Sequence, residues 1–225
     1  MIWSALGDVL PEAFGIAISP LPIVLVILML VSARARVTGP SFLAGWVLGV
    51  TVVAGIGFLL ADGTDAATDA DASDGVLVGK VLFGLFFLAM AVKQWRGRPQ
   101  PGDQPTTPKL FATVDTLGAG KAVGLGLVFC VANPKNLPLA LSAGAGIARA
   151  GVTGTDGLIT ILLFAMVASA SVAAPVIVYF AFGDRSDAIL QSWKVWLITN
   201  NSTVMVVLFS VLGAKLLGDG LGLFS

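Results

Sequence analysis

The chain has 225 residues, of which 56% are hydrophobic and only 12% are charged, and its mean hydropathy is +0.94. Soluble domains carry about a quarter charged residues, so this composition excludes an ordinary soluble domain and predicts an all-α integral membrane protein. The 13 basic and 13 acidic residues cancel, which leaves no basic surface for a nucleic acid. With no His and one Cys, we expect no metal, no cofactor and no enzyme activity.

Six apolar segments approach the length of about 20 residues that crosses a bilayer as a helix. The expected transmembrane helices cover residues 6–31, 40–60, 76–92, 122–147, 158–182 and 203–217. Little of the chain remains outside them, so the sequence predicts no separate soluble domain.

Residues 93–121 separate the third span from the fourth and contain a run of prolines typical of an extended linker. This linker predicts a first three-helix repeat over 1–95, a cytoplasmic Pro-rich linker over 96–118 and a second three-helix repeat over 119–225. Because each half has an odd number of spans, the second half enters the membrane in the opposite sense. The sequence therefore predicts a 3+3 inverted repeat.

Lys and Arg residues set the expected orientation, because cytoplasmic loops of membrane proteins are enriched in them. Nine of them follow spans one, three and five, and three lie on the opposite side. We therefore expect a multi-pass protein of the inner (cytoplasmic) membrane with both termini outside. The acidic loop 61–75 is expected on the outside as well.

The first and fourth spans share a motif in which a polar residue precedes paired prolines. These motifs are Ser19-Pro20-Leu21-Pro22 and Asn133-Pro134-Lys135-Asn136-Leu137-Pro138. Proline removes a backbone donor, so we expect spans one and four to break at Pro20, Pro22, Pro134 and Pro138. Paired interrupted helices in inverted halves indicate a transport site, although prolines also simply bend membrane helices.

Lys135 is the most informative residue, because a charge inside an apolar span must face the bundle interior and find a partner. Glu12 is the expected partner, with Asp8 one turn away as an alternative. Snorkelling of the lysine to the interface is the competing interpretation, as back-bonding to its own helix is for Ser19. The predicted substrate-binding residues are Lys135, Asn133, Asn136, Ser19 and Glu12.

The glycines at positions 45 and 49 form a small-xxx-small pattern, which within one chain favours internal helix packing over dimerisation.

The two proline motifs, together with Ala33-Arg34-Ala35-Arg36 and the helix over 39–50, resemble the glycopeptidolipid- and sulfolipid-addressing proteins of the LysE-type transporter superfamily. The similarity covers nearly the whole chain. It implies a cytoplasmic-membrane protein that exports or flips a cell-envelope glycolipid or phospholipid, with a fold containing an internal inverted repeat.

Our interpretation is a small transporter or flippase for an anionic envelope lipid, whose partners are membrane lipids. The alternatives are a LysE-type exporter of amino acids or other small solutes, and an accessory scaffold of a larger lipid-export machinery. A second copy of the chain, forming a homodimer, is a further expected partner. No ATP-binding motif is present in the sequence, so energy would come from a gradient or a partner.

Overall fold

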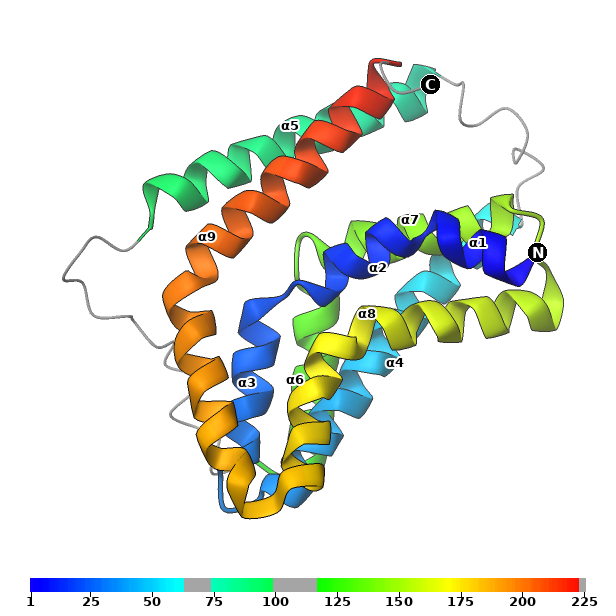
Figure 1. Ribbon diagram of the computed structural model, residues 1–225. Helices are drawn as coiled ribbons and strands as arrows, with labels where there is room; N and C mark the ends of the chain where they lie inside the picture. Colours follow the sequence, from blue (N-terminus) through cyan, green and yellow to red (C-terminus); the bar gives the residue numbers. More distant parts are fainter. Residues whose placement is uncertain (63–73, 99–116, 223–225) are drawn as a thin grey trace. The chain divides into compact units, whose positions relative to one another are not determined.

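The computed structural model describes residues 1–62, 74–98 and 117–222, and these residues are helical with short connections and contain no strand (Figure 1). The predicted all-α fold is confirmed. The helices are α1 (Ile2–Asp8), α2 (Leu10–Ala17), α3 (Pro20–Leu30), α4 (Ala35–Asp62), α5 (Asp74–Arg96), α6 (Ala119–Val131), α7 (Asn136–Arg149), α8 (Gly154–Phe182), the 3-10 helix η4 (Gly183–Arg185) and α9 (Ser186–Gly220).

Several of these helices are long and apolar enough to cross a membrane. Three ranges meet that criterion in the described residues, namely Ala35–Ala61, Leu77–Arg96 and Gly154–Gly220. Two bent helix pairs raise the number to as many as five if each pair forms one span. The chain is therefore a membrane protein with three to five candidate spans.

Both predicted helix breaks are confirmed. The first span divides into α2 and α3, which meet at an angle of 52°. The fourth divides into α6 and α7, which meet at 76°. Proline lies at the start of α3 and within the first turn of α7, where a missing N–H is tolerated, so each motif ends one helix and begins the next.

The start of the last helix differs from the prediction. α9 begins at Ser186, whereas the sequence placed the sixth span at 203–217 and a loop before it. Residues 186–202 contain charged and polar side chains, which lower their hydropathy, but no Gly or Pro, so nothing in them interrupts a helix. The helix α9 is therefore longer than the apolar segment that it contains.

The chain forms two compact units, which combine sequence segments differently from the predicted repeats. Unit 1 comprises Met1–Thr64 with Thr107–Ile198, and unit 2 comprises Asp65–Thr106 with Thr199–Ser225. Compactness and internal symmetry are separate properties, so the repeats over 1–95 and 119–225 stay a prediction. Most of the linker, 99–116, lies outside the described residues.

In unit 1, α4 packs closely against α6 and α7 through glycines. A Cβ atom at Gly45 would strike the carbonyl oxygen of Val123, and one at Gly126 would strike that of Phe42. Farther along α4, Gly144 of α7 faces the carbonyl of Ala54 in the same way. The predicted use of Gly45 and Gly49 for internal packing is confirmed, since Gly49 lies against Cys130 of α6.

Unit 2 pairs α5 with the C-terminal part of α9. The rings of Phe87 and Phe209 stack with their centroids 5.8 Å apart. Gln94 donates a hydrogen bond to Ser202 over 3.3 Å. Gly84 and Gly213 allow the two backbones to approach closely.

Candidate functional site

The end of α2 carries backbone carbonyls that its own helix does not satisfy. Pro20 has no N–H to donate to Ile16, and the Ser19 N–H turns to the Ala17 oxygen at 2.8 Å instead of continuing the helix. Buried carbonyls in this position need donors from elsewhere in the protein. The break therefore creates a cluster of acceptors inside unit 1.

Side chains supply donors to three successive carbonyls at this helix end. The Ser19 hydroxyl donates to the Ile16 oxygen at 2.7 Å, which confirms the back-bonding interpretation for that residue. Ser171 of α8 donates to the Ala17 oxygen. The Lys135 ammonium group, from the other broken helix, donates to the Gly15 oxygen at 2.6 Å. A cation at a helix C-terminus also interacts favourably with the helix dipole.

The second break positions Lys135 for this contact. Lys135 is the N-cap residue of α7, and its backbone N–H donates to the Asn133 side-chain oxygen at 3.1 Å. The Asn133 backbone oxygen accepts from the N–H groups of Asn136 and Leu137. Asn133 thus shapes the turn, and the lysine side chain leaves it toward α2.

The Lys135 ammonium group is fully coordinated by oxygen. Besides Gly15 it donates to the Ser19 hydroxyl at 2.8 Å and to the Asn136 side-chain oxygen at 2.9 Å. The Ser19 proton is already directed to Ile16, and neither carbonyl oxygen has a proton to give. Lysine donates to all three, and its protonated form supplies one N–H group for each acceptor.

Burial places this charge in the protein interior. Lys135 is 1% exposed and Asn136 is 0% exposed, so the snorkelling interpretation is wrong. Such burial is costly unless the charge is compensated, and its three hydrogen-bond acceptors are all neutral. The cluster formed by Lys135, Ser19, Asn136 and the Gly15 carbonyl, here called the lysine bridge, joins the two broken helices.

The expected pairing of Lys135 with Glu12 is not found. Glu12 lies half-buried on α2, and Asp8 is exposed on α1, but neither is an acceptor for the ammonium group. Gly15 lies about one helical turn nearer the break than Glu12, so its freed carbonyl, rather than the Glu12 carboxylate, accepts the hydrogen bond from Lys135. Of the predicted site residues, the structure brings together Lys135, Asn136 and Ser19, with Asn133 in the supporting turn.

Two further buried polar groups lie in α7 and α8. Asn136 Nδ2 and the Ser169 hydroxyl have no hydrogen-bond partner among the described residues. Asn136 Nδ2 belongs to a residue already in the lysine bridge, so it adds a spare donor next to the cation. Ser171 was missed by sequence reasoning, because it lies within a run of small residues in α8 and no pattern distinguishes it from its neighbours.

The two serines of α8 provide a matched pair of variants. Ser171→Ala leaves the Ala17 oxygen without its side-chain donor, so we expect a loss of about 1 kcal/mol in unfolding free energy. Ser169→Ala removes a buried hydroxyl without a partner and is expected to be neutral or stabilising. Thermal unfolding of the purified protein in detergent compares them. Equal losses for both variants would contradict the proposed role of Ser171.

Among the described residues, no three His, Cys, Asp or Glu side chains gather in a way that would hold a metal ion. The donors of the lysine bridge suit an anion rather than a cation.

Comparison with known protein families assigns the chain to a family. The family model described as Sap, sulfolipid-1-addressing protein, matches residues 9–222. The chain belongs to this family. No curated protein and no solved structure matches the chain. Membership of the Sap family, together with the apolar helices, makes this a membrane protein tied to lipid handling. The wider relation of this Sap-family chain to LysE-type transporters stays a prediction.

Proposed function

We propose that the protein translocates an anionic envelope lipid across the cytoplasmic membrane, with the lysine bridge as its head-group site. The observation that carries this proposal is the buried Lys135 ammonium group, which joins two broken helices and has only neutral partners. The family name refers to a sulfolipid, whose acidic head group has the charge that Lys135 complements.

An anionic head group would compete with the partners that Lys135 has in this structure. A charged oxygen is a stronger acceptor than a carbonyl, so an entering anion would displace the Gly15 oxygen from the ammonium group. That exchange releases the end of α2 from α7. Head-group binding is thereby coupled to opening between the two breaks, as an alternating-access carrier requires.

The membrane topology of this proposal has six spans in a 3+3 inverted repeat, with both termini outside. It counts α8 and α9 as separate spans within Gly154–Gly220, because the 3-10 helix η4 lies between them. The connections after α3 and after α8 line one common cavity in unit 1, which supports placing both on one side of the membrane. Glu12 remains a proposed contributor to substrate binding, and a lipid-export complex or a second copy remain proposed partners.

Lipid transfer in proteoliposomes tests the function directly. The purified chain is reconstituted with a fluorescent sulfated glycolipid in one leaflet, and the loss of that lipid from the leaflet is followed with a membrane-impermeant quencher. We expect transfer by the wild type and loss of transfer in Lys135→Met. Lys121→Met is the matched control, because Lys121 is exposed on α6 of the same bent pair and lines no part of the bridge.

Size-exclusion profiles and melting temperatures show whether each variant is folded before transfer is compared. Wild-type transfer by a folded Lys135→Met protein would overturn the proposed site. A parallel assay with radiolabelled amino acids, with no glycolipid transfer, would reassign the protein as a solute exporter.

A further inference from the structure

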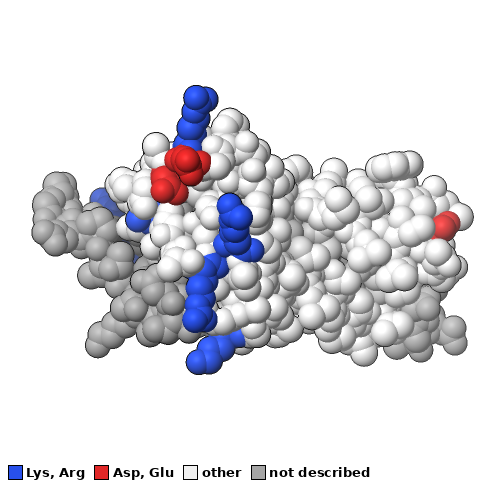
Figure 2. Space-filling model, turned by 90° about the horizontal axis from the view of Figure 1, so that it is seen from below, with Lys and Arg blue, Asp and Glu red and all other residues white. Residues whose placement is uncertain are grey.

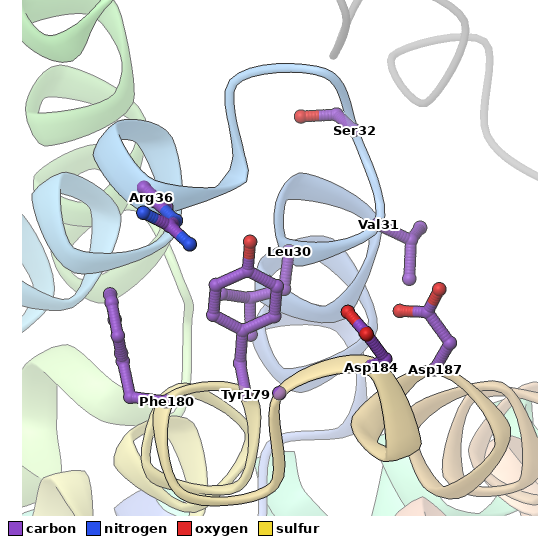
Figure 3. A pocket seen from close by; sticks show the side chains of 9 residues that line it. Leu30, Val31, Ser32, Arg36, Tyr179, Phe180, Asp184 and Asp187 are labelled. Carbon is purple, nitrogen blue, oxygen red and sulfur yellow. The ribbon is translucent and has the colours of Figure 1, made fainter.

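A second polar site lies at one end of unit 1, apart from the lysine bridge. A cavity of about 490 Å³ opens between the connection from α3 to α4 and the turn from α8 to α9 (Figure 3). Both turns lie at the lower end of the view in Figure 1. Its volume falls within the range of small-molecule sites. The residues that line it include Arg36, Tyr179, Phe180, Asp184 and Asp187.

Opposite charges line this cavity from different helices. Arg36 comes from the first turn of α4, while Asp184 lies in η4 and Asp187 in the first turn of α9. Figure 3 shows the two carboxylates side by side, with Arg36 across the cavity and the Tyr179 hydroxyl pointing into the space between. The cavity is thus lined by one group that binds anions, Arg36, and by a pair that binds cations, Asp184 and Asp187.

These charges do not neutralise each other. In the described part of the chain, no ion pair or hydrogen bond joins Arg36 to Asp184 or to Asp187. Arginine binds phosphate or carboxylate oxygens through its planar fork of donors, and two adjacent carboxylates favour an ammonium group. A ligand with a single negative charge would meet Arg36 but be repelled by the aspartates. The arrangement therefore selects a ligand that carries both charges.

The surroundings of the cavity are apolar enough for lipid. Phe180 of α8 lines the cavity and is 56% exposed. Figure 2 shows charged side chains of both signs gathered in one part of the face seen from below, with uncharged surface over most of the rest. A polar cavity bordered by an exposed aromatic side chain suits a head group whose acyl chains remain in the membrane.

We infer that this cavity binds a zwitterion with a phosphate and a primary ammonium group, as in the ethanolamine head group of a phospholipid. Arg36 and Tyr179 hold the phosphate, and Asp184 and Asp187 hold the ammonium group. This site does not depend on the translocation proposed for the lysine bridge, since it is defined by equilibrium binding.

Native mass spectrometry of the full chain in detergent measures the binding. The probes are short-chain phosphatidylethanolamine, short-chain phosphatidylglycerol, which is anionic only, and soluble phosphoethanolamine. We expect the wild type to prefer phosphatidylethanolamine to phosphatidylglycerol by about tenfold. Arg36→Gln should weaken phosphatidylethanolamine binding about tenfold, whereas Arg34→Gln, an exposed arginine outside the cavity, should not change it.

The double variant Asp184→Asn with Asp187→Asn supplies the decisive result. It should bind phosphatidylethanolamine more weakly and phosphatidylglycerol more tightly than the wild type, because the repulsion of a simple anion is gone. Asp156→Asn, an exposed aspartate at the start of α8, should leave both affinities unchanged. Soluble phosphoethanolamine that binds as tightly as the lipid would support the charge chemistry and assign a soluble ligand. Equal binding of the two lipids by the wild type and the double variant would overturn the inference.

Discussion

Gly126→Ala is expected to destabilise the protein severely, although it adds a single methyl group. The new Cβ atom would strike the carbonyl oxygen of Phe42 and lie 2.8 Å from the Trp46 backbone nitrogen. Both obstacles belong to the α4 backbone, which cannot rotate away as a side chain would. The helices α4 and α6 must separate instead, and the packing on either side of the contact separates with them.

The loss is expected to reach about 3 kcal/mol in unfolding free energy, the upper end for overpacking a well-packed core. Gly124→Ala is the matched control, because Gly124 is exposed two residues earlier on α6 and has nothing within 4 Å of its would-be Cβ. Alanine is the better helix former, so the control should be neutral or about 0.5–1 kcal/mol more stable.

Melting temperatures and the yield of monodisperse protein in detergent separate the two variants. The pair Gly57→Ala and Gly55→Ala repeats the comparison on α4, since Gly57 faces the Leu141 carbonyl and Gly55 faces open space. Similar melting temperatures within each pair would show that α4 does not lie this close to α6 and α7.

The helical elements were predictable because hydropathy and proline act locally. The broken helices followed from Pro20 and Pro134, each of which removes a backbone donor wherever the chain places it. The start of α9 was not predictable from hydropathy, because a helix continues through charged residues that a membrane span excludes. The two compact units also escaped prediction, since they depend on contacts between segments far apart in the chain.

The site was predicted in part for the same reason. Burial of Lys135 followed from the cost of a charge among apolar residues, and Ser19 and Asn136 were recognised as polar groups at the breaks. The acceptor for Lys135 on α2 was not predicted. It is the backbone carbonyl of Gly15, and the residue type at that position does not indicate whether its carbonyl is free. From the sequence alone, the carboxylate of Glu12 was the expected partner of Lys135 instead.

Asn136→Leu is expected to destabilise the protein more than the removal of the lysine charge itself. Asn136 supplies one of three acceptors to a buried ammonium group, and leucine has the same branching but no polar atom. The cation would stay buried with one N–H unsatisfied, at a cost of about 3 kcal/mol. Lys135→Met, by contrast, removes the charge and leaves neutral oxygens, so its cost should be limited to about 1–2 kcal/mol for the uncapped Gly15 carbonyl.

The double variant of Asn136→Leu with Lys135→Met should therefore be more stable than Asn136→Leu alone, since no buried cation remains to be satisfied. A second substitution that restores stability indicates a buried charge rather than packing, because a further loss of packing would not restore stability. Thermal unfolding of the wild type, both single variants and the double variant completes the cycle. If the two losses simply add, the Lys135 ammonium group is not held by Asn136, and the two broken helices are not joined in the way described.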